Sequence, residues 1–194
     1  MVLEVKRELA VPSWQPAHWL ALGFIVLVVT ALVVAPWPLM DMLHAIGSTL
    51  CPQRSSHSLF IDGVQMPLEA RKVGIFLGFL SGLLYLLAMG RGRAAGLPSA
   101  PVLATLAGFV LLMGVDSLNA LFYDLQLPRL YAPDNRIRLA TGLLNGLAVA
   151  AVALPAVNVS LWRDGREQAS LKGWRELAIL IAVQVLIFAA TMSG

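Results

Sequence analysis

Charged residues are scarce in this chain, and cysteine is almost absent. Only 13% of the 194 residues are charged and 58% are hydrophobic, and the mean hydropathy is +0.77. A soluble domain has about 25% charged and about 45–50% apolar residues. The departure excludes an ordinary soluble domain. It predicts an all-α integral membrane bundle that forms a single membrane domain over residues 1–194.

Motifs for common catalytic chemistries are missing as well. The single cysteine, Cys51, cannot form an internal disulfide, and no C-x-x-C is present. The chain also lacks G-x-x-x-x-G-K-[ST], G-x-G-x-x-G, H-E-x-x-H and G-x-S-x-G. Cys51 and His57 could form half of a metal site or a nucleophile pair, but two ligands are too few for a structural zinc. We therefore predict neither a catalytic residue nor a metal.

Long apolar runs are what the chain does have. A transmembrane helix needs about 17–25 apolar residues. A single segment that crosses lipid must be helical, because only a helix satisfies all backbone hydrogen bonds within the segment. Five segments reach that length: 19–36, 73–89, 101–123, 137–162 and 174–192. The sequence therefore predicts about five transmembrane helices.

The distribution of lysine and arginine predicts the orientation. With the N-terminus inside, eight basic residues are cytoplasmic and six are outside, and the short loop "GRGRAAG" at 90–96 is purely basic. Cytoplasmic loops are enriched in lysine and arginine. We therefore predict a cytoplasmic N-terminus and an extracytoplasmic C-terminus. The polar stretch 51–72 is then an extracytoplasmic cap between the first and second helices.

Glycines recur at helical spacing in two of the predicted spans. Small residues four apart allow helix backbones to approach closely inside lipid. The sequence predicts a helix-packing face, whose partner is either internal or another subunit, from these residues: Gly74, Gly78, Gly82, Gly142 and Gly146.

Ionisable residues enter the spans from the predicted outer side. Asp116 and Asn119 share one face of the third span, and Arg138 and Asn145 share a face of the fourth. Arg71, at the start of the second span, is another candidate partner for Asp116. A lone carboxylate inside the membrane costs at least about 2.5 kcal/mol, so Asp116 is expected to be paired, protonated or hydrated. The cluster is either a structural clamp or a site for a proton, a quinone, a lipid headgroup or an anion.

The cap carries its own polar residues, and the segment before it, "LMDMLHAIGSTL", predicts a short amphipathic helix. A free cysteine is most often a small buried hydrophobic residue. The cap residues that we single out are Cys51, Arg54, His57, Glu69 and Lys72.

The stretch "LCPQRSSHSLFIDGVQMPLEARKVGIFLGFL" resembles the signature of a bacterial family of multi-span membrane proteins with a domain of unknown function. That signature runs C-H-Q-x-P-x-R-S, then P-x-C-A-R-C-x-G-I-Y-x-G, then a helical aspartate and N-x-x-R-x-x-T-G-x-x-x-G. The matching residues, spread over about 50–147, are Cys51, Gln53, Arg54, Pro67, Ala70, Arg71, Gly74, Ile75, Gly78, Asp116, Asn135, Arg138, Thr141, Gly142 and Gly146.

This chain departs from that signature at three positions. Pro52 stands in place of the histidine, and Glu69 and Lys72 stand in place of the two later cysteines. The resemblance implies that any thiol or metal chemistry of the family is lost here. Glu69 and Lys72 are three apart and are expected to form a local ion pair instead. The resemblance also implies a bacterial inner membrane location, but it implies no activity.

These observations lead to one expected function and two alternatives. We expect a non-catalytic accessory or assembly subunit of a larger membrane complex, for which a respiratory or photosynthetic electron-transfer complex is one host. The first alternative is a small transporter or a lipid- or quinone-binding protein that uses the Asp/Arg cluster. A membrane enzyme at the outer surface is the second. We predict no cofactor apart from a bound lipid or quinone in the first alternative. Expected partners are membrane lipids and other membrane subunits, without nucleic acid.

Overall fold

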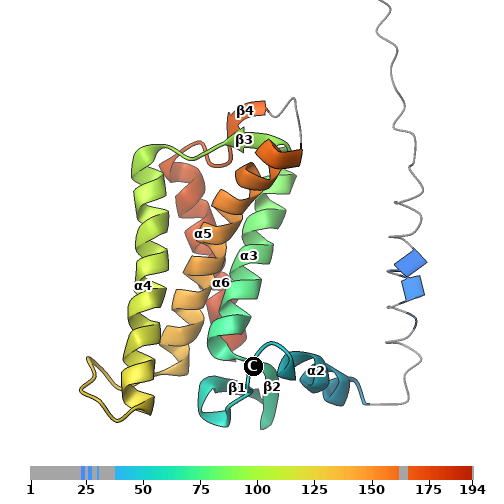
Figure 1. The fold of residues 1–194 in the computed structure, drawn as a ribbon. Helices are drawn as coiled ribbons and strands as arrows, with labels where there is room; N and C mark the ends of the chain where they lie inside the picture. Colours follow the sequence, from blue (N-terminus) through green and yellow to red (C-terminus); the bar gives the residue numbers. More distant parts are fainter. Residues whose placement is uncertain (1–22, 25, 28–29, 31–37, 162–165, 194) are drawn as a thin grey trace, which may run out of the picture. The chain divides into compact units, whose positions relative to one another are not determined.

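A bundle of long apolar helices dominates the structure, a computed structural model that describes residues 23, 24, 26, 27, 30, 38–161 and 166–193. Four helices in this part are long and apolar enough to cross a membrane. They are α3 (Ala70–Ala88), α4 (Ala100–Asp124), α5 (Asn135–Leu161) and α6 (Trp174–Ser193). The predicted all-α membrane bundle is confirmed (Figure 1). Most of the first predicted span, 19–36, lies outside the described residues.

Contacts within the chain define two units, residues 1–42 and residues 43–194. The described residues of the first unit include the beginning of α2 (Leu39–Ser48), which is the short helix expected before the cap. The second unit contains the four long helices together with the short strands that connect them.

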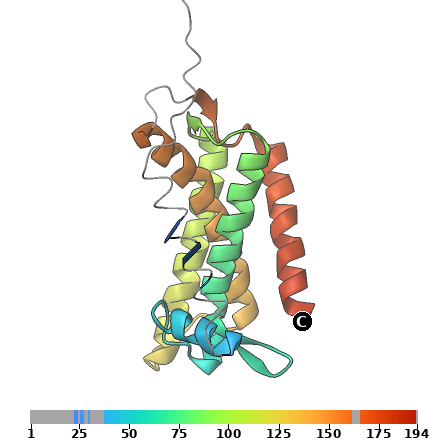
Figure 2. The same cartoon turned by 90° about the vertical axis from the view of Figure 1, so that its right-hand side faces the viewer.

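Short elements connect the long helices at the two ends of the bundle. The cap, residues 51–69, contains η1 (Ser55–His57) and an antiparallel hairpin of β1 (Ser58–Ile61) and β2 (Val64–Glu69). At the opposite end, β3 (Ala94–Gly96) pairs in parallel with β4 (Arg166–Ala169). We call these the cap end and the β3 end. Figures 1 and 2 show the hairpin at one end of the helices and β3 with β4 at the other.

The glycines form the closest helix contact, between α3 and α5. A Cβ atom built on Gly78 would lie 2.2 Å from the carbonyl oxygen of Leu143. A Cβ on Gly146 would lie 2.2 Å from the carbonyl oxygen of Ile75. Only glycine permits this approach, which brings backbone against backbone and maximises dispersion contacts. The partner of the glycine face is therefore internal.

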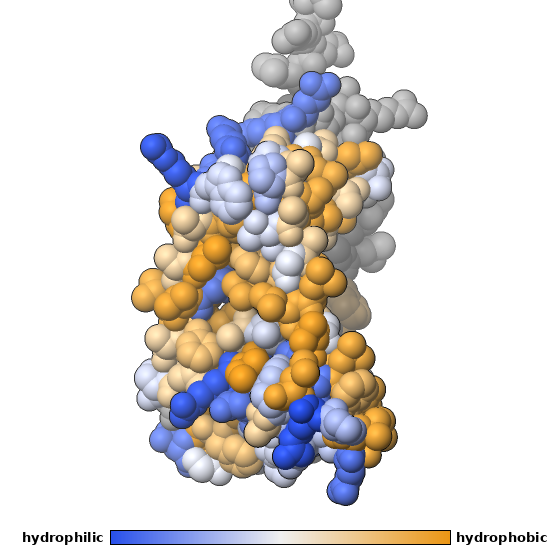
Figure 3. Space-filling model, turned by 90° about the vertical axis from the view of Figure 1, so that its left-hand side faces the viewer, coloured by the Kyte–Doolittle hydropathy of each residue, from blue (hydrophilic) through white to orange (hydrophobic). Residues whose placement is uncertain are grey.

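Helix α5 is the central helix of the four. Half of its membrane window, 50%, is buried, against 17% for α4 and for α6. It contacts α3, α4 and α6. Figure 1 shows α5 crossing obliquely between α4 and α3, so that it diverges from α4 toward the β3 end. The face formed by α4 is mainly apolar across its middle (Figure 3), as expected for a surface in contact with lipid.

Two apolar clusters hold the second unit together. The larger lies toward the β3 end and contains Leu86, Val102, Leu106, Leu147, Ala148, Ala151, Leu171, Leu177 and Leu180. The smaller lies under the cap and contains Leu59, Ala70, Val73, Leu139 and Leu143. Because Leu59 belongs to β1, its side chain attaches the hairpin to α3 and α5.

A proline inside α5 explains one contact at the β3 end. Pro155 has no N–H, so the carbonyl of Ala151 one turn earlier loses its helical partner. The hydroxyl of Ser170 donates to that carbonyl at 2.7 Å, and Ser170 is fully buried. Asn158 donates its amide to the carbonyl of Ala94 in β3 at 2.8 Å. The Ser170 hydroxyl thereby replaces the donor that the proline lacks and attaches the residues after β4 to α5, while Asn158 attaches β3.

Candidate functional site

Asp116 is the centre of the polar cluster at the cap end. It lies on α4 about two turns before the helix ends, and only 2% of its surface is exposed. Its Oδ2 accepts a hydrogen bond from Nη2 of Arg71 at 2.6 Å, and the two side chains form an ion pair. Its Oδ1 accepts the hydroxyl of Tyr131 at 2.7 Å. Both carboxylate oxygens are therefore bonded to protein, and the charge is paired, as the sequence allowed.

Asn119 positions Tyr131, a residue that the sequence analysis did not single out. Its Oδ1 accepts the backbone N–H groups of Leu130 and Tyr131 at 2.8 and 3.3 Å, and its Nδ2 donates to the carbonyl of Tyr131 at 3.0 Å. Tyr131 lies in the loop between α4 and α5, where no periodic pattern marks it. Burial, and then the bond to Asp116, raise the pKa of Tyr131 to about 12. The phenol is thus a neutral donor at physiological pH.

Of the two candidate partners for Asp116, Arg71 pairs with it and Arg138 does not. Arg138 lies in the first turn of α5 and is 4% exposed. Its Nη1 donates to the carbonyl of Ser56 at 3.1 Å and to Oδ1 of Asn135 at 2.7 Å. No ion pair involving Arg138 occurs within the described ranges. The side chain is directed to η1 of the cap, because Arg71 of α3 already occupies the carboxylate.

Asn145 does not join the cluster by hydrogen bonding. It is 7% exposed and lies about two turns beyond Arg138 on α5. Within the part of the chain that the structure describes, its amide makes no hydrogen bond to Asp116, Asn119 or Arg138. The predicted five-residue cluster is therefore an Asp116–Arg71 pair with Asn119 beside it and Arg138 bonded separately.

The cap is held down by side-chain bonds to backbone. The turn of its hairpin, Asp62–Gly63, has positive φ at both residues, which is typical of a tight two-residue turn. Gln53 donates to the carbonyls of His44 and Pro67, both at 2.8 Å. Asn135 at the start of α5 donates to the carbonyl of Ser58 at 3.0 Å. The cap thus bonds directly to α5.

An exposed ion pair links the cap to the end of α4. Arg54 Nη1 lies 2.7 Å from Oδ2 of Asp124, and Nε2 of His57 lies 3.8 Å from the same oxygen. The side chain of Arg54 is 53% exposed, so its pair contributes little to stability. Burial, and then the Arg138 charge, lower the pKa of His57 below its usual 6.5. His57 is therefore mainly neutral at pH 7.

The predicted ion pair between Glu69 and Lys72 is not formed. Glu69 Oε1 accepts the backbone N–H of Arg54 at 3.3 Å, while the Lys72 ammonium donates to the carbonyl of Leu50. Glu69 thus joins β2 to Arg54 of the cap, and Lys72 joins α3 to Leu50, the residue just before the cap. Cys51 is buried, at 5% exposure, with its Sγ 3.7 Å from the carbonyl of Gly47, which fits the role of a small core residue. Among the described residues, no three side chains of His, Cys, Asp or Glu are placed to hold a metal.

A second clamp at the β3 end also escaped the sequence reasoning. Arg91 is 3% exposed and binds Glu176 of α6 through both terminal nitrogens, and it also donates to the carbonyl of Ser170. The loop "GRGRAAG" contains no acid, but Arg91 in this loop is paired with Glu176 from another segment of the chain. The predicted topology placed Arg91 and the start of the fifth span on the same side of the membrane. The sequence therefore allowed this pair to be predicted.

The comparisons with known proteins agree with this architecture. A family model described as "Predicted membrane protein (DUF2085)" matches residues 51–152, which is more than half of the 194-residue chain. The chain belongs to this family. The matched region of this DUF2085 member runs from the cap through α3 and α4 into α5, and it contains Arg71, Asp116 and Arg138. Searches of curated proteins and of solved structures found no match.

The bonds of Asp116 join α4 to α3 and to the loop before α5. Each carboxylate oxygen of Asp116 already accepts one hydrogen bond, Oδ2 from Arg71 and Oδ1 from Tyr131. Tyr131 donates its only proton to the same carboxylate. Among the described residues, the buried Nε atoms of Arg71, Arg91 and Arg138 have no hydrogen-bond partner, and of these three arginines only Arg138 also lacks an ion pair.

Proposed function

We propose that this DUF2085 member is a non-catalytic subunit that assembles with other proteins in a larger membrane complex. The observation that carries the proposal is the apolar surface of the hairpin, which lies beyond the membrane-spanning helices. Ile61 and Val64, which pair beside the hairpin turn, are 37% and 49% exposed, and Phe60 on the opposite face of the hairpin is 52% exposed. Exposed apolar side chains outside the lipid-facing surface are typical of a protein interaction site. The Asp116 pair supports the proposal, because its carboxylate is already bonded to Arg71 and to Tyr131.

The experiment compares what co-purifies with the wild type and with a hairpin variant. The full chain is extracted in mild detergent and its native mass is measured. The double variant Phe60→Ser and Val64→Ser is expected to lose the partner at an unchanged melting temperature, since both residues are exposed. Leu97→Ser, at an exposed apolar position near the β3 end, is the matched control and is expected to keep it. A wild type that runs alone, or a hairpin variant that keeps the partner, would overturn the proposal.

The host complex is proposed to be an electron-transfer complex of a bacterial inner membrane. The membrane class of the chain supports this proposal. Haem or flavin absorbance in the purified complex would be expected, and its absence would exclude this host while leaving the subunit proposal intact.

We propose the orientation that the basic residues predict, with the N-terminus cytoplasmic and the cap outside. The counts of eight and six basic residues support it, because the bias acts during membrane insertion. The test is labelling of Gly92→Cys in a Cys51→Ser background by an impermeant thiol reagent. Labelling is expected only after the membrane is opened, and labelling from outside would invert the topology.

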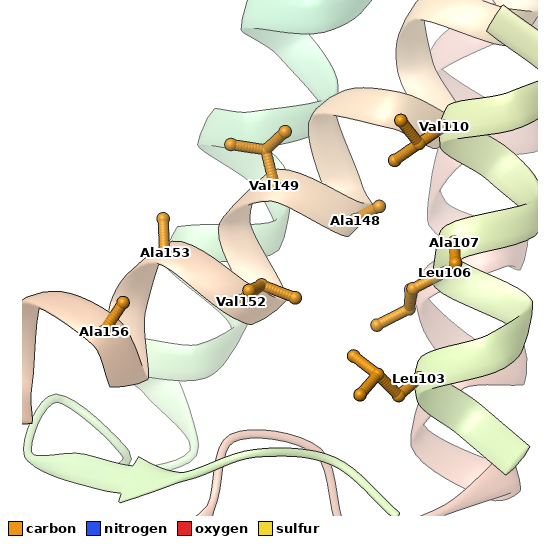
Figure 4. Close-up of a pocket in the computed structure, with 9 residues that line it drawn as sticks. All are labelled: Leu103, Leu106, Ala107, Val110, Ala148, Val149, Val152, Ala153 and Ala156. Carbon is orange, nitrogen blue, oxygen red and sulfur yellow. The ribbon is translucent and has the colours of Figure 1, made fainter. Parts of the chain in front are cut away.

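A lipid- or quinone-binding protein is the second candidate, and one observation favours it. An apolar groove of about 360 Å³ lies between α4 and α5 toward the β3 end, where the two helices diverge. Figure 4 shows Leu103, Leu106 and Val110 of α4 facing Ala148 and Val152 of α5 across it. Its volume is within the range of about 300–1,000 Å³ that is usual for ligand pockets. Its lining of alanine, valine and leucine is suited to an acyl or isoprenoid chain.

Filling the groove tests this second candidate. Ala107→Phe with Ala153→Phe places two rings in the groove and is expected to remove a lipid or quinone that the wild type retains in native mass spectra. Leu111→Phe is the control, because Leu111 of α4 is 69% exposed and does not line the groove. This variant is expected to retain the lipid or quinone. Equal retention in all three proteins would show that the groove binds nothing specifically.

A further inference from the structure

Arg138 is a buried cation without an anionic partner of its own. It is 4% exposed, and both of its hydrogen bonds use Nη1 and end on neutral acceptors, the Ser56 carbonyl and the Asn135 amide. An uncompensated charge in a buried place is costly, so such a group normally finds a counter-ion. No anionic group among the described residues is in contact with Arg138, so a bound anion would stabilise its charge.

The nearby carboxylates are already committed. Asp116, Asp124 and Glu69 act on Arg138 only through space. Asp116 is bonded by Arg71 and Tyr131, Asp124 is bonded by Arg54, and Glu69 accepts the Arg54 backbone N–H. The charge of Arg71 also repels that of Arg138. Two guanidinium groups thus share one neighbourhood in which a single carboxylate is bound directly.

The geometry of the guanidinium shows which of its edges is open. Nη1 is fixed by Ser56 and Asn135, so the edge formed by Nε and Nη2 is directed elsewhere. Nε is buried and has no partner. Both hydrogen bonds that Arg138 makes within the described part of the chain use Nη1, so Nη2 makes none. Nε of Arg71 is likewise buried and unpartnered. Two parallel N–H groups on one edge match two oxygens of a carboxylate or phosphate group.

We propose that the Nε–Nη2 edge of Arg138, with Arg71 beside it, binds a phosphate group at the cap end of the bundle. Arg138 lies in the first turn of α5, where a membrane helix meets the interface and lipid phosphates are found. Basic pockets between transmembrane helices bind lipid headgroups in this way. The phosphate belongs either to a lipid headgroup or to free inorganic phosphate. This site is separate from the α4–α5 groove, which lies toward the β3 end.

The test measures the melting temperature of the delipidated full chain in neutral detergent. One arm adds inorganic phosphate against potassium chloride of equal ionic strength, and the other adds phosphatidylglycerol against diacylglycerol with the same chains. We expect one phosphate-bearing probe to raise the melting temperature with increasing concentration, as a ligand of the native state does. The arm that responds identifies the source. No response above the chloride and diacylglycerol controls in either arm would overturn the proposal.

Variants locate the site. Arg138→Gln removes the charged edge and is expected to weaken half-saturation at least about tenfold, the scale of a charge-assisted hydrogen bond. Arg136→Gln removes an exposed arginine from the same turn and is expected to bind like the wild type. If Arg138→Gln fails to fold, Arg138→Lys decides. It keeps the charge but offers no paired N–H edge, so it is expected to bind about tenfold more weakly as well. Equal binding by Arg138→Lys and the wild type, or equal losses in the Arg136 and Arg138 variants, would refute the assignment.

Discussion

A double-mutant cycle on Asp116 and Arg71 tests the clamp on which the cap end depends. The carboxylate is 2% exposed, and its side chain makes one ion pair and one hydrogen bond to Tyr131. Breaking a buried pair by removing one partner costs about 3–5 kcal/mol. The Arg71 side chain keeps 23% of its exposure, and Tyr131 still bonds the carboxylate after Arg71→Ala. We therefore expect a loss near the low end, about 3 kcal/mol, for that single variant.

The double variant is expected to lose much less than the sum of the two single losses. Asp116→Ala leaves Arg71 without its counter-charge and should also cost about 3 kcal/mol. Once both groups are gone, neither charge remains unpaired inside the membrane. The expected coupling free energy is therefore about 2 kcal/mol, within the usual range of about 0.5–3 kcal/mol for contacting residues.

The measurement is the free energy of unfolding in mixed micelles, obtained by titrating a denaturing detergent and following tryptophan fluorescence. Arg136→Ala is the control, since this arginine is exposed and an exposed change usually alters stability by at most about 0.5 kcal/mol. If the losses of the single variants add to within about 0.5 kcal/mol, the two side chains are not coupled. That result would refute the interpretation of the pair as a clamp.

Other contacts lead to three more predictions. Gly78→Ala should lower the free energy of unfolding by about 3 kcal/mol, because the new methyl group meets a backbone oxygen of α5 at 2.2 Å. Gly108→Ala, where a Cβ atom meets nothing within 4 Å, should be neutral or stabilising, and equal effects of the two in a thermal melt would contradict the close contact. Glu176→Gln should cost about 1–3 kcal/mol in the same assay, because the 3% exposed Arg91 loses its charged partner, and an unchanged melt would exclude the β3-end clamp. The pKa of Tyr131 is raised from 10.0 to about 12, so the folded state holds this proton more tightly than the unfolded state does. The stability it contributes is present below pH 10 and is lost as the pH rises toward about 12, so Tyr131→Phe should flatten that part of the pH dependence of stability, and identical profiles would contradict the bond.

Several features of this DUF2085 member are determined by the sequence alone. The low charge and the long apolar runs determine a helical membrane protein, because lipid offers no partner to an exposed backbone. Glycines at a spacing of four determine a close helix contact. The position of Asp116 inside a span determines that its charge must be paired, neutralised by a proton or hydrated, because an isolated carboxylate in lipid is too costly.

The tertiary structure alone decided which groups meet. Helical spacing gives the face on which a residue lies and its depth, but not which neighbouring helix that face meets. For this reason it could not tell that Arg71 binds Asp116 while Arg138 turns to the carbonyl of Ser56. Tyr131 reaches the carboxylate from a loop, whose path is set by the bonds of Asn119 and by no periodic pattern. A pattern along one helix contains no information on contacts across the bundle, and those contacts pair one arginine and leave the other with an open edge.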